Sequence, residues 1–166
     1  MAETALRGNT VNTSGDLPAV GSDGPSFNLT GSDLAPISSA DLAGQRVVLN
    51  IFPSIDTPTC QQSVRTFNER AAGLDNTTVL CVSADLPFAA GRFCGAEGIE
   101  NVRTGSTFRN PEFLSDYGVG MVDGPLHGLA ARAVVVLDES GSVVHQQLVP
   151  EIAEEPDYDA ALGALS

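Results

Sequence analysis

The feature that most constrains the fold is a short apolar run, rich in β-branched residues, over Val47–Phe52. Gly44 precedes it and Pro53 follows it, and runs of this length between turn residues are typical of a buried central strand. Downstream, Gln61–Leu74 repeats apolar residues at helical spacing and therefore predicts an amphipathic helix. A strand followed directly by a helix is the repeating unit of α/β folds.

The same pattern continues along the chain. Thr78–Ser83 predicts a second strand, and a helix introduced by Asp85-Leu86-Pro87 runs to Cys94. Strands over Ala133–Leu137 and Val143–Leu148 are joined by residues typical of a hairpin turn. The shorter predicted elements are a hairpin at 6–11, a connection at 15–26, a strand at 102–104, a helical stretch at 110–117 and a closing helix at 156–165.

Alternating strands and helices, then an antiparallel hairpin and a last helix, predict an α/β fold with a mixed central sheet flanked by helices. With 166 residues, of which 42% are hydrophobic, the chain has the length and the apolar content of one domain. We therefore predict a single domain over 1–166, with residues 1–26 forming an N-terminal β-hairpin and its connection.

The charge balance excludes several classes of partner. A formal net charge of −13 repels nucleic-acid phosphate and anionic lipid head groups, so we expect neither nucleic acid nor a membrane as partner. All eight basic residues are arginine. Two explanations stay open for the absence of lysine, a genome that disfavours lysine codons and adaptation to high salt.

The N-terminus and the cysteine count indicate an intracellular protein. Met1–Gly15 is polar and lacks the apolar core of a secretion signal, and no stretch has the length of a membrane span. Three widely spaced cysteines, Cys60, Cys81 and Cys94, make a structural disulfide framework improbable. We therefore expect a soluble, cytoplasmic protein whose cysteines need separate explanations.

Cys60 is the candidate nucleophile. The chain leaves the buried strand, turns over two prolines and brings Cys60 into the first turn of the next helix, where free N–H groups favour a thiolate. Thr57 precedes it by three residues, close enough for its hydroxyl to bond the sulfur or a bound oxygen. Local position alone leaves open the alternative of a buried, inert cysteine.

The predicted topology brings further residues toward Cys60. Because the first two strands are parallel, the loops that follow them share one sheet edge, and we expect both Cys60 and Cys94 there. Arg132 comes just before the strand that begins at Ala133, so antiparallel pairing puts its charge at the same edge. Cys81 lies inside an apolar strand and predicts a packing role. His127 and His145 show no ligand spacing, and we expect no metal.

Four segments of the chain form a further, combined pattern: Pro-Ser-Ile-Asp-Thr-Pro-Thr-Cys at 53–60, Ser-Ala-Asp-Leu-Pro-Phe-Ala at 83–89, Arg-Phe-Cys-Gly-Ala-Glu-Gly at 92–98 and Leu-Ala-Ala-Arg-Ala-Val-Val-Val-Leu-Asp at 129–138. Together, in this order, they resemble the peroxiredoxins, and within them the bacterial thiol peroxidase branch. With Glu-Pro-Asp-Tyr at 155–158, the resemblance extends over at least residues 47–163.

The resemblance implies a thioredoxin-like fold, a homodimer and a peroxidase without metal or organic cofactor. It implies that Cys60 is oxidised by hydrogen peroxide or alkyl hydroperoxides to a sulfenic acid, with Thr57 and Arg132 orienting the substrate and Pro53 shielding the site. Cys94 matches the resolving cysteine, which forms an intramolecular disulfide with Cys60 that thioredoxin then reduces.

Two other functions are alternatives to a peroxidase. A thiol–disulfide exchange enzyme carries Cys-x-x-Cys, and this chain has Thr57 at the first cysteine position of that motif. A redox sensor would use the pair Cys60 and Cys94 to report slow oxidation to a partner protein. Rapid peroxide turnover separates the peroxidase from both.

Overall fold

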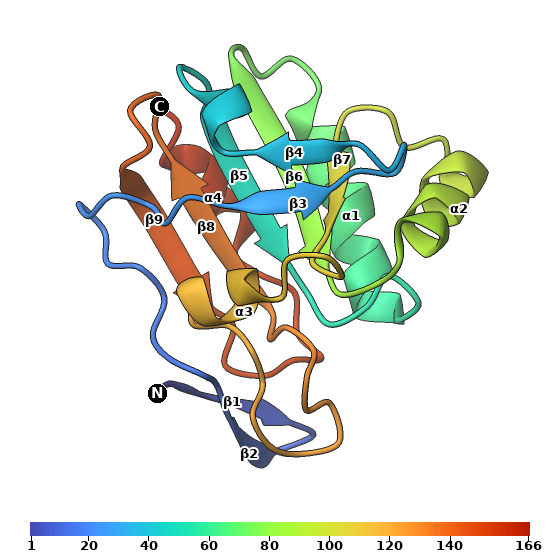
Figure 1. Cartoon of the computed structure of the whole chain (residues 1–166), viewed down its shortest axis with the longest axis vertical. Helices are drawn as coiled ribbons and strands as arrows, with labels where there is room; N and C mark the ends of the chain where they lie inside the picture. Colours follow the sequence, from blue (N-terminus) through green and yellow to red (C-terminus); the bar gives the residue numbers. More distant parts are fainter.

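The structure is a computed structural model that describes all 166 residues. Its main sheet has seven strands in the order β4-β3-β7-β6-β5-β8-β9, and a separate hairpin pairs β1 with β2 (Figure 1). The strands are β1 Glu3–Leu6, β2 Asn9–Asn12, β3 Asn28–Thr30, β4 Pro36–Ser38, β5 Arg46–Ile51, β6 Thr77–Ser83, β7 Arg103–Ser106, β8 Ala133–Leu137 and β9 Val143–Leu148. The helices are η1 Ala40–Leu42, α1 Pro58–Ala71, α2 Pro87–Glu97, α3 Glu112–Asp116 and α4 Tyr158–Gly163.

Strand β5 holds the centre of the sheet. It pairs parallel to β6 and antiparallel to β8, with Ile51 opposite Ala133. Neighbouring residues on a strand point to opposite faces, and β5 is buried on both: Leu49 joins one core cluster and Val48 joins the other. The predicted mixed sheet and its N-terminal hairpin are confirmed.

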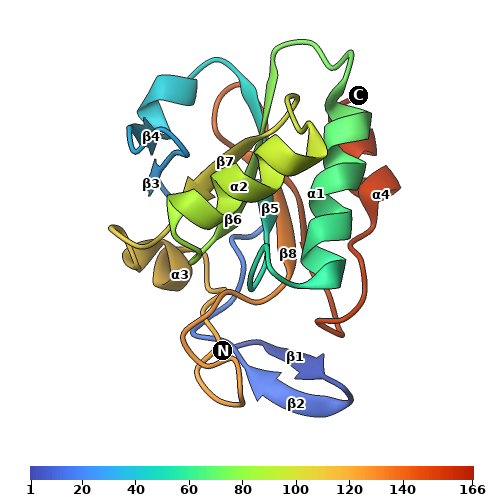
Figure 2. The same ribbon diagram turned by 90° about the vertical axis from the view of Figure 1, so that its right-hand side faces the viewer.

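Each face of the sheet is covered by different elements. Helices α1, α2 and α4 lie together on one face, and α3, η1 and the β3–β4 hairpin lie on the other side (Figure 2). The core beneath α1 contains Val64 and Phe67, whereas the opposite core contains Phe113 and Tyr117 from the α3 region. None of the helices combines the length and apolar character that crossing a membrane requires.

The N-terminal hairpin packs against loops rather than against the main sheet. A third buried cluster joins Val11 of β2 to Met121, Ala131 and Ile152, and Leu6 of β1 packs against it. The hairpin therefore lies beside the segment before β8 and the segment after β9.

Several element bounds differ from the sequence-based expectations. Helix α1 begins at Pro58, three residues before the predicted start. Proline fits the first helical position because the backbone N–H that it lacks would have no partner within the helix there. Helix α2 continues past Cys94 to Glu97 and ends at Gly98, whose φ of 65° is left-handed. Strands β3 and β4 and the helix η1 were not predicted, because segments this short carry no periodic pattern.

Gly118 fixes the N-terminal connection against the end of α3. Its φ is +68°, and a Cβ built there would overlap the carbonyl group of Asp16 and lie 2.8 Å from the amide nitrogen of Asp16. Both surfaces are backbone, which cannot rotate away. The connection at 15–26 is thus held by close backbone packing as well as by hydrogen bonds.

We predict that Gly118→Ala lowers the free energy of unfolding by at least ~3 kcal/mol, because it adds both a left-handed strain and a backbone clash. Gly128→Ala is the matched control: its φ is +95°, yet no heavy atom lies within 4 Å of the added Cβ. It should cost only about 1–2 kcal/mol. Urea denaturation measures both, and equal losses would contradict the assigned close approach.

Candidate active site

Cys60 lies in the first turn of α1, as the sequence predicts. Thr57 lies at the N-cap position in an extended conformation, and Pro58 occupies the first helical position. The proline ring restricts φ and so fixes the direction in which the chain enters the helix. The thiol of Cys60 is fully buried. The amides of Thr59 and Cys60 donate to no group within the chain, which leaves two N–H donors free beside the sulfur.

Arg132 brings its charge to this sulfur. Its Nη2 donates to the Cys60 Sγ over 3.2 Å and its Nε donates to the Ile152 carbonyl over 2.7 Å. The side chain is 1% exposed, and its Nη1 has no hydrogen-bond partner. A buried guanidinium nitrogen without an acceptor is costly unless a ligand supplies one. The third donor group of Arg132 is therefore available to a bound oxygen.

The antiparallel pairing of β5 and β8 explains the meeting of these two residues. Ile51 at the end of β5 is opposite Ala133 at the start of β8. Arg132, just before Ala133, therefore lies at the same edge of the sheet as the loop that leads from β5 to Cys60. The sequence predicts that Arg132 lies at the same sheet edge as Cys60 if its strand runs antiparallel to the central strand. The structure confirms that β8 and β5 are antiparallel. A fixed positive charge at the sulfur stabilises the thiolate.

Thr57 has a partner that the sequence did not indicate. Its hydroxyl donates to the Ser54 carbonyl over 2.9 Å, so the Thr57 oxygen is left as an acceptor for an incoming O–H group. No hydrogen bond joins Thr57 to the Cys60 sulfur. Pro53 is buried and lines the same hollow as Thr57 and Arg132.

A hollow of about 470 Å³ opens above this group. Its walls come from the N-terminal hairpin, the loop before α1, the segment before β8 and the segment after β9. Apart from Arg7 and Arg132 the walls carry no charge. The lining residues are Leu6, Arg7, Pro53, Ser54, Thr57, Pro58, Thr59, Pro125, Leu126, Leu129, Arg132, Ile152 and Ala153.

Cys94 does not share the sheet edge with Cys60, and that expectation was wrong. It lines a different hollow with Val102 and Thr104, at the start of β7. The reason is that the predicted helix itself leads away from the edge: at ~1.5 Å per residue, the seven residues from Pro87 to Cys94 carry the thiol ~10 Å along the helix axis. All three cysteines are free thiols.

Burial disfavours the thiolate form of the two remaining cysteines. Burial raises the pKa of Cys94, and burial raises the pKa of Cys81 to about 12, against a hydrogen bond from Asn50 that acts in the opposite direction. Cys81 lies within β6 and packs in the core beneath α1. Its surroundings agree with the predicted packing role.

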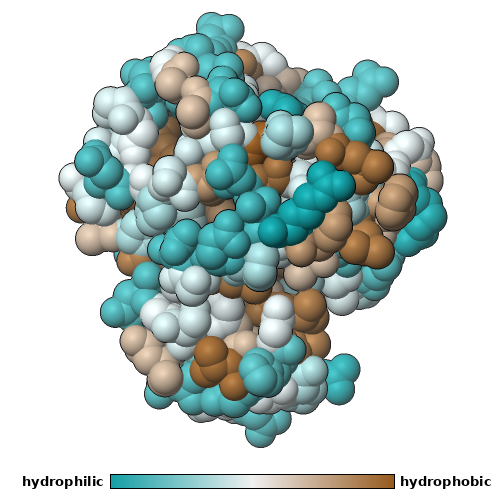
Figure 3. Space-filling model, in the orientation of Figure 1, coloured by the Kyte–Doolittle hydropathy of each residue, from teal (hydrophilic) through white to brown (hydrophobic).

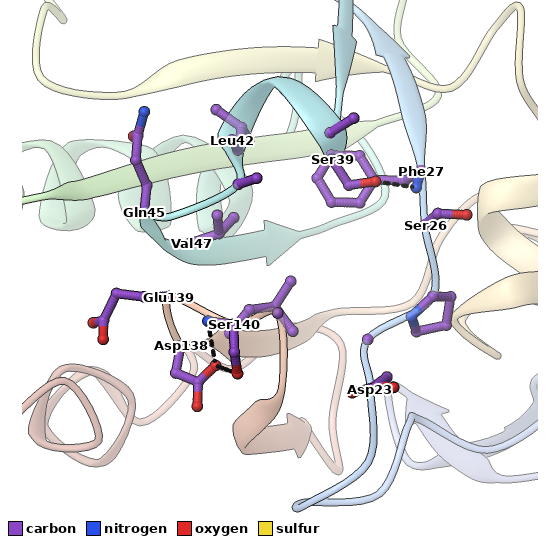
Figure 4. A pocket seen from close by; sticks show the side chains of 16 residues that line it. Asp23, Ser26, Phe27, Ser39, Leu42, Gln45, Val47, Asp138, Glu139 and Ser140 are labelled. Atoms are coloured by element: carbon purple, nitrogen blue, oxygen red, sulfur yellow. Dashed lines mark hydrogen bonds between the residues drawn. The ribbon is translucent and has the colours of Figure 1, made fainter.

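A second hollow, of about 290 Å³, lies at the opposite end of the sheet (Figure 4). Its walls include Phe27, Gln45 and Glu139, and its lining contains no cysteine, histidine or arginine. The Asp138 carboxylate in this lining already accepts hydrogen bonds from the amide and the hydroxyl of Ser140, in the turn before β9. No group of three or more His, Cys, Asp or Glu side chains is placed to hold a metal ion.

Asp85 is a site residue that sequence reasoning missed. Its carboxylate accepts hydrogen bonds from the Ser54 hydroxyl and the Ile55 amide, both over 2.7 Å, in the loop that leads to Cys60. The available signal was its place directly after a predicted strand, at the same sheet edge as the loop before Cys60. It was interpreted only as the start of a helix.

Comparisons with known proteins agree with one another. The family model described as Redoxin matches residues 19–162. Thiol peroxidase of Mycobacterium tuberculosis is 61% identical over 165 residues, covering 99% of each chain, and that of Corynebacterium glutamicum is 57% identical over 166 residues, covering 100% of each. The chain belongs to the thiol peroxidases of the redoxin family. It is therefore an enzyme of the peroxiredoxin type, and its activity is thiol-dependent peroxide reduction.

Solved structures support the thiol peroxidase fold. The peroxiredoxin-like protein of Aquifex aeolicus superposes with a TM-score of 0.93 at 39% identity, covering 98% of this chain and 95% of its own. Thiol peroxidase from Chromobacterium violaceum superposes with a TM-score of 0.87 at 20% identity, covering 98% and 94%, and shows likeness of fold. The thioredoxin-like fold implied by the sequence resemblance is confirmed.

We predict that Arg132→Lys lowers the rate constant for reaction with peroxide by about tenfold or more, since an ammonium cannot bond the sulfur, the Ile152 carbonyl and a substrate oxygen in one planar fork. The measurement is competition for peroxide with a peroxidase of known rate constant.

Arg70→Lys is the matched control for Arg132→Lys. Arg70 forms an exposed ion pair with Asp159 at 2.5 Å, on the surface of α1. It should stay within about twofold of wild type, because exposed pairs contribute little. An Arg132→Lys variant as fast as this control would remove Arg132 from the site.

Proposed function

We propose that this thiol peroxidase reduces hydrogen peroxide and alkyl hydroperoxides with Cys60 as the attacking thiolate. The observation that carries the proposal is Arg132, which bonds the Cys60 sulfur over 3.2 Å and keeps Nη1 without a partner. The free amides of Thr59 and Cys60 supply further donors at the same helix start. Donors aimed where charge develops are the main source of stabilisation in such a transition state.

The first step transfers one oxygen to sulfur. The thiolate attacks the terminal oxygen of the hydroperoxide, the S–O bond forms and the O–O bond breaks. Cys60 becomes a sulfenic acid, and the departing alkoxide or hydroxide takes up a proton to leave as alcohol or water. Arg132 and Thr57 align the two oxygens for in-line attack, and Pro53 keeps bulk water from the sulfur.

The walls of the hollow favour organic substrates in addition to hydrogen peroxide. Leu6, Leu126, Leu129 and Ile152 form apolar surface around the entrance to Arg132. An alkyl chain that contacts this surface gains about 25 cal/mol per Å² of apolar area buried. Neutral hydroperoxides also enter an acidic protein without electrostatic repulsion.

Cys94 resolves the sulfenic acid in the proposed cycle. Its thiolate attacks the Cys60 sulfur, the oxygen leaves as water and an intramolecular disulfide forms; the dithiol of thioredoxin then reduces that disulfide. The two Cα atoms must come within about 4.4–6.8 Å, so α2 has to unwind locally. Gly91 and Gly95 weaken the helix, and leaving its half-buried site removes the burial that raises the pKa of Cys94.

We predict that Cys94→Ser keeps the first oxidation of Cys60 but stops thioredoxin-linked turnover, because nothing else in the chain resolves the sulfenic acid. Peroxide-dependent NADPH consumption with thioredoxin and its reductase measures turnover, and peptide mapping should find a Cys60–Cys94 disulfide in the wild type. Cys81→Ser is the matched control and should cycle normally. Wild-type protein that reacts with peroxide without turning over would indicate a redox sensor instead.

We further propose a homodimer formed through the apolar surface at the start of α2. Leu86, Phe88 and Phe108 are exposed there, Phe88 by 68%. The backbone of Asp85 accepts a hydrogen bond from Ser106, so these side chains come from adjacent loops. Figure 3 shows hydrophobic surface gathered over this side of the molecule. Neighbouring exposed apolar side chains of this size are typical of an interface.

We predict that Phe88→Asp shifts the protein toward monomer, because it puts a charge into the proposed interface. Val20→Asp is the control, since Val20 is 61% exposed in the N-terminal connection on the far side from α2 (Figure 1). Sedimentation equilibrium measures both. A wild type that is monomeric at micromolar concentration, or a Phe88→Asp dimer as tight as the wild type, would contradict the proposal.

The remaining parts of the proposed cycle need no further component. Peroxide supplies the oxidant and thioredoxin the electrons, so we propose no metal and no organic cofactor. A dithiol reductant of this kind is a component of the cytoplasm, which is the proposed location.

A further inference from the structure

The carboxylate of Asp85 joins two loops that both matter to the proposed cycle. Asp85 lies between β6 and α2, two residues before Pro87, which begins the helix of Cys94. Its Oδ1 accepts from the Ser54 hydroxyl and its Oδ2 accepts from the Ile55 amide, each over 2.7 Å. Ser83 donates to the same Oδ2 over 2.6 Å. Three donors from two segments therefore converge on one carboxylate.

The bond to Ser54 continues to Thr57. The Ser54 hydroxyl accepts from the Asp56 amide over 3.1 Å, and the Ser54 carbonyl accepts from the Thr57 hydroxyl over 2.9 Å. Asp85 thus fixes the position of Ser54. Ser54 in turn fixes the orientation of the Thr57 side chain, which contacts the peroxide in the proposed function. The carboxylate lies outside the group that touches substrate, so any effect on the reaction passes through this loop.

Asp85 is anchored on its other side to the sheet. Its carbonyl accepts a hydrogen bond from Ser106 of β7 over 2.5 Å, and Ser106 is buried. The start of α2 is consequently held at a fixed distance from the sheet while the carboxylate holds the loop before Cys60. Asp85 therefore connects both the loop before Cys60 and the start of α2 to the sheet.

A second, exposed link runs parallel to this one. Arg92 of α2 pairs with Asp56 of the same loop over 2.7 Å, and Arg65 of α1 pairs with Glu97 at the end of α2 over 2.5 Å. Exposed pairs of this kind contribute up to about 1 kcal/mol each and are screened by salt. The partly buried, charge-assisted bonds of Asp85 are the stronger connection.

We propose that Asp85 is a positioning residue that favours the peroxide-reducing conformation and opposes the conformation that forms the disulfide. The inference rests on the proposed function and names the contact that balances its two steps. With Asp85 in place, the loop presents Thr57 correctly and α2 keeps its first turn, so oxidation is fast and resolution waits for local unwinding. Without it, the loop is less ordered and α2 is released.

The proposal therefore predicts opposite changes in two successive rate constants. Asp85→Asn removes the negative charge and one of the two acceptor oxygens, so the three bonds from Ser54, Ile55 and Ser83 cannot all be kept as they are. Oxidation of Cys60 should slow by about tenfold, because misplacing the aligning groups removes orientation from the transition state. Conversion of sulfenic acid to disulfide should speed up by about fivefold, because the folded helix loses bonds that it has to break.

The experiment follows both steps by rapid mixing with hydrogen peroxide, acid quench, alkylation and mass spectrometry of the intact protein. Cys60 oxidation is measured in the Cys94→Ser background, and disulfide formation in the chain with Cys94. Ser54→Ala is a second variant that breaks the link from the loop side and should change both rates in the same directions, should Asp85→Asn fail to fold.

Asp138→Asn is the matched control, because the Asp138 carboxylate also accepts hydrogen bonds within a turn but lies at the opposite end of the sheet from Cys60. Its oxidation rate should stay within about twofold of wild type. Variants in which both rates fall together, or in which neither changes, would overturn the positioning role. A wild type that does not react with peroxide would instead overturn the proposed function, so the two failures are distinguishable.

Discussion

The contact between the Arg132 guanidinium and the Cys60 sulfur is the interaction on which the site depends. A charge that is 1% exposed is strongly unfavourable unless polar groups surround it. The Ile152 carbonyl and the Cys60 sulfur are the two partners present. They belong to segments that are far apart in sequence, so the site exists only when the strands β5, β8 and β9 have assembled. The reactive thiol is a property of the folded chain.

A second polar chain fixes the first turn of α1 from inside the core. Asn50 lies on β5 among apolar neighbours and donates from Nδ2 to the Ser63 hydroxyl over 3.1 Å. Ser63 in turn donates to the Cys60 carbonyl over 2.7 Å, and both side chains are fully buried. Buried polar groups that are paired in this way specify one register of a helix against a sheet. Cys60 is thus held by Arg132 at its side chain and by this chain at its backbone.

The sequence predicted those parts of the structure that repeat a pattern or complete a motif. Strand β5 and helix α1 were predicted from apolar periodicity, and the place of Cys60 at the helix start followed from them. Arg132 was placed only on the condition that its strand runs antiparallel to β5, and the structure shows that pairing. The strand and the helix follow from local patterns in the sequence, whereas the pairing of β5 with β8 is a long-range contact.

The parts that were missed or wrong depend on contacts between distant segments. The three-residue strands β3 and β4 pair with each other, and β3 joins the sheet where Thr30 lies opposite Ser106 of β7; their own residues carry no periodic signal. Cys94 was put at the wrong place because only its distance along the chain from the end of β6 was considered, and not the length of the helix between them. Helix α2 is held by contacts with a distant segment, since Phe93 is buried and Arg65 of α1 lies 5.4 Å from its ring centre. Tertiary packing extends a helix that propensity alone leaves marginal.

The same packing creates a conflict that an enzyme of this kind has to balance. In the proposed cycle, an ordered site favours oxidation of Cys60, but the burial of Cys94 raises its pKa, so the sulfenic acid would persist until α2 loosens. During that interval a second peroxide molecule can oxidise it irreversibly. Phe93 and the exposed ion pairs stabilise α2, whereas each of its internal glycines, Gly91 and Gly95, costs ~1 kcal/mol. In the proposed cycle, we expect these glycines to favour opening of α2 before a second oxidation.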